Sequence, residues 1–433
     1  MSERRKMLFV FPTDWDARQL DSCRTAWEAQ FDVAYSEPSD WDCAWDLDIL
    51  GWIEDAVRHW DGAVAGVTSS SDYPGATVAA ALAQKLGLPG PDPAVVLGCS
   101  HKYEARRLQR DVVPEATPRF DVLDPDDPDS QPRSAGFPCF VKPVKGAFSV
   151  MSGRIDSAAE LRAFFSRPSA RSFRTEFVHI FNQLVRRYTR FETDGGAFIA
   201  EELLDGMQVT VEGYSTDDEV VVLGVTDSEL DPRTRSFVRF VHPSALPESV
   251  QRRMHDVAIR VVRGAGLWRA FFNIEMLYDA GRDVVRIVEV NPRICGQFGD
   301  LYQKVGGRNS YEIALEVASG AVPAPPKPGG GAHAVAASVP LRVFEPVRVA
   351  RAPDADDVRA AEALYPGTMV WNECKTGQEL ADFESIEDGH SCRYAVVNVG
   401  APDRDSLVER MQRVRERLGY RFEALEPRGS SGG

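Results

Sequence analysis

Residues 268–296 read WRAFFNIEMLYDAGRDVVRIVEVNPRICG, and this stretch predicts a β-hairpin. Two runs rich in β-branched and aromatic residues, Phe271–Tyr278 and Val284–Val290, have the pattern of strands. They flank the short segment DAGRD, whose glycine and aspartates are typical of a tight turn. We therefore expect two antiparallel strands in direct contact at this point of the chain.

The acidic residues of this hairpin fall at positions that predict a metal site. Side chains alternate between the two faces of a strand, so Glu289 and Asn291 point the same way. With Tyr278 paired to Val284 across the turn, Glu275 joins them on that face. Unpaired carboxylates among hydrophobic neighbours are costly, and carboxylate and amide oxygens suit magnesium. The alternative is an exposed hairpin that carries these charges on its solvent-facing side.

An arginine follows the second strand of the hairpin. Arg293 comes directly after Pro292, a residue that ends strands. A metal site beside an arginine is typical of phosphoryl transfer, since both neutralise charge on the transferred phosphate. This combination favours the metal site over the exposed hairpin.

The size and charge of the chain limit its class. With 433 residues it can form about three domains or lobes around a large core. The formal net charge of −15 argues against a nucleic-acid or anionic-membrane partner, and no run of about 20 apolar residues could span a bilayer. The seven cysteines are scattered without CxxC spacing, so we expect free thiols in a reducing cytoplasm and no zinc site.

Strand and helix patterns alternate in the first part of the chain, which predicts an α/β layer. Lys6–Phe11 and Asp61–Val67 have the pattern of strands, and Ala76–Leu86 that of a helix ended by Gly87. No GxGxxG motif follows the first strand, so we expect no dinucleotide site there. Further strands are predicted at Phe137–Val144, Phe198–Leu204, Val209–Tyr214 and Glu219–Thr226, and helices after Ser157 and at Pro247–Arg263.

The segment 319–331, SGAVPAPPKPGGG, is the clearest linker, and a small α+β lobe is expected after it. In that lobe we predict strands within 332–350 and at 395–399, and a helix at Ser406–Leu418 with a capping box between Ser406 and Glu409. The chain is expected to divide into four parts, at residues 1–100, 101–200, 201–330 and 331–433.

Two lysines and a small-residue loop indicate an anion-binding site upstream of the hairpin. Lys102 falls in the first turn of a predicted helix capped by Ser100, where a cation opposes the helix dipole unless an anion is bound nearby. Lys142 ends an apolar strand, and a buried lysine there needs a partner. The loop 145–153, KGAFSVMSG, can place backbone N–H groups on phosphate oxygens.

The order of these elements resembles the ATP-grasp superfamily. A lysine at a helix start is followed by Lys142 and the small-residue loop, by EELLDG at Glu201–Gly206, and by the hairpin motif Glu-x-Asn-Pro-Arg. The resemblance implies an α/β ATP-grasp fold with a Rossmann-like domain before the grasp and a small C-terminal α+β lobe. Two segments are similar to those of carboxylate–amine ligases that resemble L-amino acid ligases, Val221–Asp227 and His242–Ser244.

The resemblance also implies roles by position. ATP and two magnesium ions are the implied cofactors, and a small-molecule carboxylate and an amine are the implied substrates. Glu275, Glu289 and Asn291 would hold the ions, while Arg293 would steady the acyl phosphate. The residues implied to contact ATP are Lys102 and Lys142 at the phosphates, Ser149 in the lid loop, Glu201 and Leu204 beside the adenine, and Gln208 at the ribose.

Two features bear on substrate choice. Many family members carry a glutamate where this chain has Gln208, and an amide makes a weaker, uncharged contact with a ribose. The segment 231–243, DPRTRSFVRFVHP, is a basic cluster in an acidic protein. We expect that one of three residues binds a substrate carboxylate, unless the segment is a solvated charged loop: Arg235, Arg239 or His242.

The resemblance therefore implies an ADP-forming enzyme that joins a carboxylate to an amine through an acyl phosphate. Two other functions stay open. A biotin-carboxylase-like enzyme would form carboxyphosphate from bicarbonate, and a regulatory module would bind ATP without cleaving it. Related enzymes use the last lobe to cap the active site or to build a dimer, and its sequence here decides neither.

Overall fold

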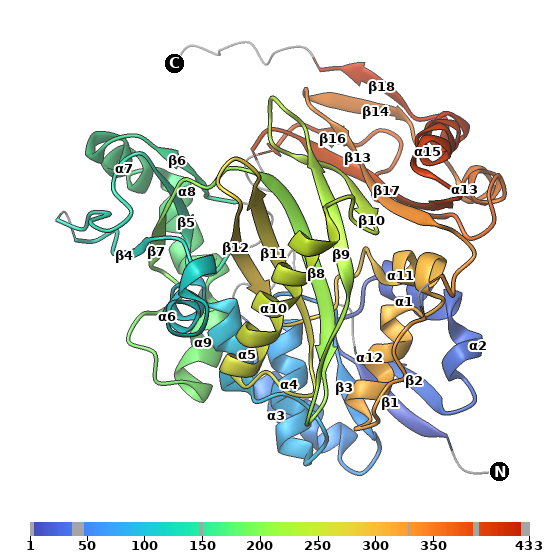
Figure 1. Cartoon of the computed structure of the whole chain (residues 1–433), viewed down its shortest axis with the longest axis horizontal. Coiled ribbons are helices and arrows are strands. Elements are labelled where there is room, and N and C mark those ends of the chain that lie inside the picture. Colours follow the sequence, from blue (N-terminus) through green and yellow to red (C-terminus); the bar gives the residue numbers. More distant parts are fainter. Residues whose placement is uncertain are drawn as a thin grey trace.

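The computed structural model of the chain describes residues 4–36, 47–127, 129–146, 150–327, 329–383 and 389–425. Within these ranges lie four β-sheets, of three, four, eight and three strands, with helices packed on and between them (Figure 1). The architecture is α/β, as the sequence patterns predict.

The N-terminal sheet is parallel. Helix α4 (Gly75–Leu86) lies beside it and ends at Gly87, whose φ of 67° is the left-handed conformation expected of a helix-ending glycine. The prediction of a strand from Asp61 is wrong, because α3 (Ile49–Trp60) runs into a turn and the strand begins only at Gly66. In spatial order the strands are β2 (Phe31–Tyr35), β1 (Arg5–Phe9) and β3 (Gly66–Thr68).

A four-stranded antiparallel sheet lies at the left of Figure 1. Helix α7 (Ala158–Phe165) begins after Ser157, as predicted, and the Ser157 hydroxyl accepts a hydrogen bond from the backbone N–H of Glu160. Helices α8 (Pro168–Ser172) and α9 (His179–Tyr188) occupy a stretch that has no clear pattern in the sequence. In spatial order the strands are β4 (Phe120–Leu123), β7 (Phe198–Glu202), β5 (Cys139–Pro143) and β6 (Gly153–Ile155).

An eight-stranded antiparallel sheet forms the centre of the molecule. The chain enters it from β7 through residues 203–206, so the two strands predicted around Asp205-Gly206 belong to different sheets. The sheet continues across residue 330, and the predicted division of the chain there stays a prediction. In spatial order the strands are β12 (Val284–Asn291), β11 (Phe271–Asp279), β8 (Met207–Ser215), β9 (Val220–Leu230), β10 (Phe237–His242), β13 (Val335–Val343), β17 (Cys392–Ala401) and β15 (Met369–Asn372).

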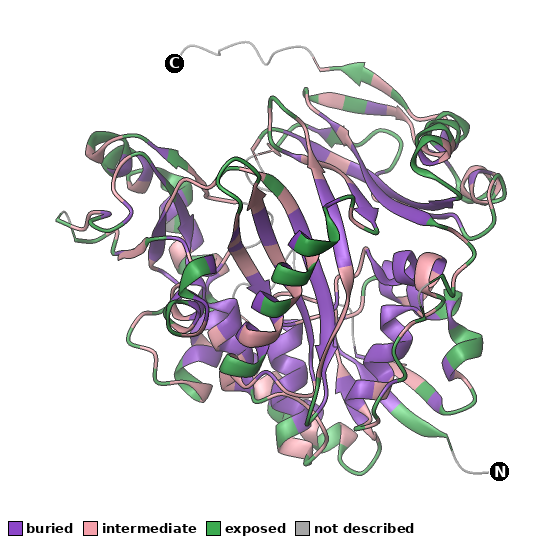
Figure 2. Cartoon of the chain, in the orientation of Figure 1, coloured by how far each residue is buried: buried purple, intermediate pink, exposed green. Residues whose placement is uncertain are grey.

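The two faces of this sheet differ in chemistry. One face is apolar and packs against α10 (Glu248–Ala265), through buried residues such as Val211, Ile274 and Met276. The other, which we call the polar face, is also largely buried, and α11 (Gly299–Gly306) packs on the part formed by β10, β13 and β17. The central strands of the sheet are coloured mainly as buried residues in Figure 2. The side chains of the polar face include Thr210, Glu212, Thr226, Ser228, His242, Asn273, Glu275, Ser338 and Asn398.

The C-terminal residues complete the large sheet and form their own apolar core around Val339, Val397 and Leu407. Helix α15 (Arg404–Leu418) starts earlier than predicted, because Asp403 is its N-cap and accepts a hydrogen bond from the N–H of Ser406. The predicted capping box at Ser406 is therefore wrong. The remaining elements of this part are β14 (Val347–Arg351), α13 (Ala355–Glu362), β16 (Glu379–Leu380) and β18 (Arg421–Ala424).

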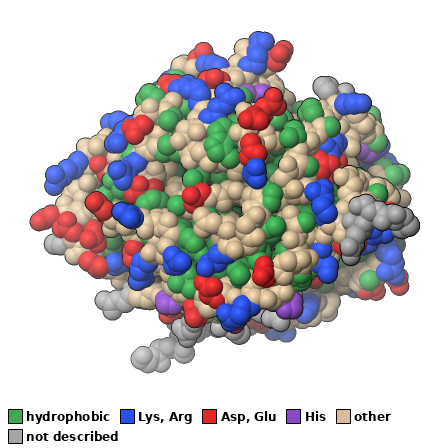
Figure 3. All heavy atoms as spheres, turned by 90° about the horizontal axis from the view of Figure 1, so that it is seen from below, with side chains coloured by type: hydrophobic (Ala, Val, Ile, Leu, Met, Phe, Trp, Pro, Cys, Tyr) green, Lys and Arg blue, Asp and Glu red, His purple; other side chains and the backbone are tan. Residues whose placement is uncertain are grey.

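Charged side chains of both signs lie on the surface of the molecule. Basic side chains are scattered between acidic ones on the face seen in Figure 3. Among the described residues, no helix combines the length and the apolar character needed to cross a membrane.

Candidate functional site

The hairpin forms as predicted, but its register differs. Tyr278 pairs with Val285 rather than Val284, so the assumed register is wrong by one residue. The pairing then shifts again beyond Met276, where a bulge adds Val288 to β12. The bulge brings Glu289 directly opposite Glu275, which is closer than the predicted diagonal arrangement.

The two facing carboxylates, Glu275 and Glu289, repel each other. Burial, with the negative charge of Glu289 as the second cause, raises the pKa of Glu275 to about 7. Gln208 donates a hydrogen bond from Nε2 to Glu275 Oε2 at 2.9 Å, and this side chain therefore lies at the carboxylates. Asn291, opposite Asn273 on the adjacent strand, is 5% exposed. An added cation between these oxygens would relieve the repulsion.

The donor set fits a hard cation. The described residues contain no group of three or more His, Cys, Asp and Glu side chains placed to hold a metal ion. The candidate here has two carboxylates, Glu275 and Glu289, and the amide of Asn291, so phosphate oxygens or water must complete any coordination. That composition suits magnesium and does not suit zinc.

Lys102 reaches Glu289, one of the two carboxylates, from a helix outside the hairpin. It is the first residue of α6 (Lys102–Val112), and its Nζ lies 2.6 Å from Glu289 Oε1. The N-cap of α6 is His101, which accepts a hydrogen bond from the N–H of Glu104, so the prediction of Ser100 as the cap is wrong. Ser100 instead ends the preceding helix, α5 (Pro93–Ser100).

Lys142 belongs to a buried ion cluster beside the hairpin. Glu201 accepts from Arg106 Nε at 2.7 Å and pairs with Lys142 Nζ at 2.9 Å. Burial alone would raise the pKa of Glu201, but the two cations outweigh it and hold the pKa at about 2. Lys142 and Arg106 also donate to the carbonyl of Val288, the bulge residue, at 3.2 and 2.8 Å. The cluster therefore fixes the bulge that aligns the carboxylates.

Arg106 makes several of the hydrogen bonds in this cluster, and its replacement should change the stability of the fold. It is 2% exposed and bonds Glu201 and the carbonyls of Ile287 and Val288. We predict that Arg106→Ala lowers the free energy of unfolding by about 3 to 5 kcal/mol, because it leaves buried groups without partners. Urea denaturation measures this. The neighbouring Arg107→Ala should change it by less than about 0.5 kcal/mol, since Arg107 is 54% exposed; equal losses would contradict the prediction.

Arg293 lies beyond the carboxylates, next to Asp72 of the N-terminal part. Its Nε is 3.7 Å from Asp72 Oδ1, and Lys145 donates to Asp72 Oδ2 at 2.9 Å. Burial opposes ionisation of Asp72, but Lys145 and Arg293 hold its pKa at about 2. The Nε of Arg293 is buried and has no hydrogen-bond acceptor among the described residues. This N–H group therefore makes no hydrogen bond within the described part of the chain.

Glu212 is a second buried acid on the polar face, and sequence reasoning missed it. It is fully buried, and its Oε2 accepts hydrogen bonds from Asn273 Nδ2 at 3.0 Å and the N–H of Cys295 at 3.2 Å. Its Oε1 has no partner among the described residues. Burial raises the pKa of Glu212 to about 8.

The raised pKa of Glu212 predicts a pH effect on stability. Between the ordinary pKa of 4.5 and about 8, the folded protein keeps a proton that the unfolded chain releases. This contribution to folding is complete at low pH and is lost as the pH rises through about 8. Glu212→Gln cannot ionise, so we expect it to raise Tm relative to the parent at about pH 9 and to change it little at about pH 5. Equal shifts at both pH values would contradict this.

The structure places the three predicted substrate-binding residues in different environments. His242 lies on the polar face, 3.3 Å from the Thr226 hydroxyl, with its ring over Gly224. Arg239 instead forms an ion pair with Glu229. Arg235 sits at a positive φ of 63° in the turn before β10. Of these three residues, only His242 lies on the polar face.

Of the remaining predicted ATP contacts, the structure describes Leu204 and Glu201. Leu204 lies in the connection between β7 and β8, at the junction of the two sheets. The carboxylate of Glu201 is fully engaged by its two cations, so a contact with adenine through it would require their displacement. Ser149 lies outside the described residues.

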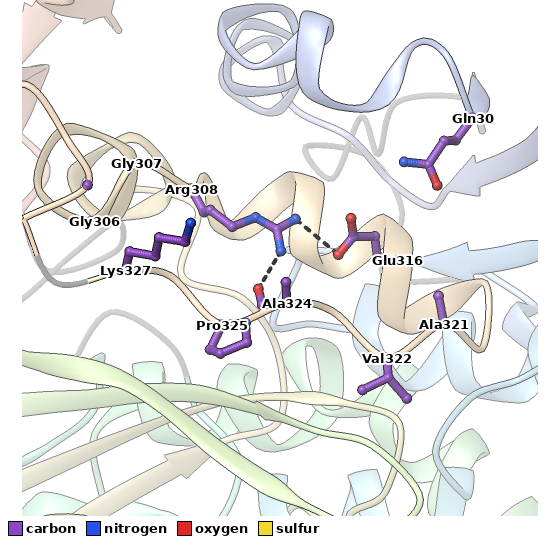
Figure 4. A pocket seen from close by; sticks show the side chains of 11 residues that line it. Gln30, Gly306, Gly307, Arg308, Glu316, Ala321, Val322, Ala324, Pro325 and Lys327 are labelled. Carbon is purple, nitrogen blue, oxygen red and sulfur yellow. Dashed lines mark hydrogen bonds and ion pairs between the residues drawn. The ribbon is translucent and has the colours of Figure 1, made fainter.

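A surface pocket lies apart from this site. It is lined by Gln30, the turn at Gly306 and Gly307, and linker residues such as Pro325 (Figure 4). Arg308 crosses it and donates to the carbonyl of Ala324 at 2.5 Å. None of the predicted site residues lines it.

Comparisons with known proteins agree with this architecture. Residues 135–300 match the family model described as the ATP-grasp domain. The whole chain is similar in structure to an L-amino acid ligase from Bacillus licheniformis, with a TM-score of 0.73 and 16% identity over 98% of this chain and 100% of the other. A comparison with curated sequences found no similar protein.

Two further solved structures are similar at lower scores. A biotin carboxylase from Campylobacter jejuni has a TM-score of 0.66 and 14% identity, over 97% of this chain and 92% of the other. An N5-carboxyaminoimidazole ribonucleotide synthetase from Thermotoga maritima has a TM-score of 0.64 and 13% identity, over 97% of this chain and 100% of the other. At these identities the similarity concerns the fold.

Proposed function

We propose that this chain is an ADP-forming ligase that joins a carboxylate to an amine, because residues 135–300 match the ATP-grasp family model and the chain is similar in fold to an L-amino acid ligase. The reaction has two steps. A carboxylate oxygen attacks the γ-phosphorus of ATP, ADP leaves, and an acyl phosphate forms. The amine nitrogen then attacks the acyl carbon, phosphate leaves, and the nitrogen loses a proton.

One observation supports this proposal most strongly. The facing carboxylates of Glu275 and Glu289 meet Lys102 from α6 at one end of a buried polar face. Lys142 lies beside them through its contact with the bulge carbonyl, and Arg293 lies two residues beyond the end of β12. Acids that suit cations and cations that suit phosphates thus converge from two sheets and a helix. A site for a single neutral ligand would need neither set.

We assign the ATP contacts to the cations and to the junction of the sheets. Lys102 and Lys142 lie where phosphate oxygens could replace their present carboxylate and carbonyl partners. Leu204 lies in the connection between the sheets and Gln208 follows it on β8, and we assign the base and the ribose to this junction. Ser149, which lies outside the described residues, stays a predicted ATP contact. Water must be excluded from such a site, because it hydrolyses acyl phosphates.

We assign the metal to Glu275, Glu289 and Asn291. Bound magnesium would supply charge neutralisation between two anionic reactants. The chain itself contributes the alignment of the two carboxylates, through the bulge held by Arg106 and Lys142. Arg293 offers a planar fork to the oxygens of the acyl phosphate, and Asp72 keeps that guanidinium in place until the substrate arrives.

A substrate screen with ADP detection tests the proposal. The purified protein is given ATP, magnesium and pairs of carboxylic acids and amines, and products are identified by mass. ADP release that requires both an acid and an amine, with an amide as product, is the expected result. Release with bicarbonate alone would support a carboxyphosphate-forming enzyme. Tight ATP binding with no release in any mixture would support a regulatory module.

A further inference from the structure

We propose that Trp15 is a positioning residue for Arg293. Trp15 fixes the segment that carries the arginine through the carbonyl of Gly296, and Trp371, near the other end of the chain, holds Trp15 in turn. This inference rests on the proposed ligase function, because Arg293 has its role in that reaction.

The segment that carries Arg293 lies outside the helices and strands. It consists of residues 292–298, which join β12 to α11, and we call it the arginine segment. A stretch without a ladder or a helix depends on other partners for its backbone groups, and here side chains of other elements supply them. Three such hydrogen bonds join the arginine segment to the fold: Cys295 N–H to Glu212 Oε2 at 3.2 Å, Trp15 Nε1 to the carbonyl of Gly296 at 2.8 Å, and Asn398 Nδ2 to the carbonyl of Gln297 at 2.8 Å.

Trp15 differs from the other two partners in its origin. Glu212 and Asn398 belong to the large sheet, whereas Trp15 lies on α1 (Asp14–Ser22) in the N-terminal part of the chain. Its side chain is 1% exposed, and its one N–H donor is fully used by Gly296. Trp15 therefore fixes the arginine segment relative to a part of the molecule outside the sheet.

The same turn of α1 also contacts the loop on the other side of Arg293. The next residue, Asp16, is 1% exposed and accepts a hydrogen bond from the hydroxyl of Ser70 at 2.6 Å. It also accepts from the hydroxyl of Tyr311. Ser70 precedes Asp72, the ion partner of Arg293, by two residues. The start of α1 thus holds both the segment that carries the arginine and the loop that carries its acidic partner.

Trp371 holds Trp15 from the C-terminal side. It lies on β15, at the edge of the large sheet, and its ring stacks on that of Trp15 with 5.7 Å between centroids and 13° between planes. Such a pair is favourable beyond the area that it buries. Arg393 lies over the Trp371 ring at 5.5 Å, and Arg18 of α1 pairs with Glu362 of α13 at 2.5 Å. The last part of the chain therefore contributes to the alignment of Arg293 through Trp15.

This arrangement has a chemical consequence. Misplacement of a reacting or stabilising group by about 1 Å can cost about 100-fold in rate. An acyl phosphate that Arg293 does not hold also survives for longer before the amine attacks. Water can then attack its acyl carbon, which releases phosphate and returns the acid. Loss of the Trp15 contact should therefore lower turnover and separate ATP cleavage from amide formation.

Trp15→Phe tests this, because it keeps an aromatic ring beside Trp371 and removes the N–H. With the acid and amine found in the substrate screen, kcat should fall about 10- to 100-fold, while Kd for ATP stays within about twofold of the parent. More phosphate than amide should form. Trp27→Phe is the matched control on α2 (Arg24–Trp27), since Trp27 is 6% exposed and its Nε1 donates to the carbonyl of Leu20 at 3.1 Å. It should keep the parent kcat within about twofold and equal amounts of phosphate and amide.

A double-mutant cycle separates positioning from a general loss of stability. If Trp15 acts through Arg293, adding Trp15→Phe to Arg293→Ala should change kcat by less than about twofold. An equal fold-loss in both backgrounds would overturn the proposal. So would a parent-like kcat of Trp15→Phe, or an equal loss in Trp27→Phe.

Two further measurements keep the proposal testable if Trp15→Phe does not fold. Trp371→Leu leaves the N–H of Trp15 in place but removes the stacked ring, and it should lower kcat about tenfold with little change in Kd for ATP. A kcat within about twofold of the parent would overturn the proposal. Amide hydrogen exchange of the arginine segment should be faster in Trp371→Leu and Trp15→Phe than in the parent or Trp27→Phe, and unchanged exchange would also overturn it.

Failure of this inference differs from failure of the proposed function. If no acid and amine give ADP, the ligase function is overturned, and the exchange measurement still tests whether Trp15 holds the arginine segment. If the parent makes an amide but the Trp15 and Trp371 variants match it, only the positioning role is overturned.

Discussion

Arg293→Ala should lower kcat about 100- to 1000-fold, because it removes one preorganised donor to a charge that develops in the transition state. The affinity for ATP should stay close to that of the parent. Arg293 lies two residues beyond the end of β12 and has a buried Nε without a hydrogen-bond acceptor among the described residues. Its contacts form chiefly with the reacting group, so the loss falls on turnover rather than on ATP binding.

The measurement pairs steady-state kinetics with ATP binding by calorimetry. Arg282→Ala is the matched control, since Arg282 lies in the turn of the same hairpin with its side chain 78% exposed. It should retain the parent kcat within about twofold. Arg293→Lys should recover little activity, because an ammonium group does not reproduce the planar fork. A kcat for Arg293→Ala within about twofold of the parent would contradict the role given to Arg293.

Glu289→Gln should lose more than about 100-fold of the magnesium-dependent activity, since loss of a metal ligand exceeds the effect of an outer contact. The substitution removes one of the two facing charges and the partner of Lys102. A neutral amide attracts a divalent cation less than a carboxylate does, and higher magnesium concentrations should restore part of the activity.

Activity is measured across a magnesium titration, with Glu248→Gln as the control at a carboxylate that is 84% exposed. The control should follow the parent curve. Full activity of Glu289→Gln at ordinary magnesium concentrations would count against the metal assignment. A loss that no magnesium concentration reduces would point to the Lys102 contact instead of the ion.

The hairpin could be predicted from sequence because its signals are local. Strand patterning, a turn segment and a terminal proline all fall within residues 268–296. The bulge at Val288 could not be predicted, since its carbonyl is held by Arg106 and Lys142, which lie far away in the chain. Register therefore depended on tertiary contacts that no local pattern contains.

The burial of the polar face could not be predicted from the sequence either. In the sequence, Glu212 alternates with apolar residues of its strand, which is also the pattern of a solvent-facing position. It is buried because the opposite face packs on α10 while other parts of the chain cover this one. Asp72 and Lys145 were missed for a related reason, since each is an ordinary loop residue until the fold joins them.

The central claim is that this chain activates a carboxylate by transferring the γ-phosphoryl group of ATP to it. An isotope measurement tests it most directly, with an acid from the screen labelled with ¹⁸O in both carboxylate oxygens. If an acyl phosphate forms, the inorganic phosphate released after amide formation carries one ¹⁸O atom per turnover. Phosphate free of the label, or release of AMP and pyrophosphate in place of ADP, would contradict the claim.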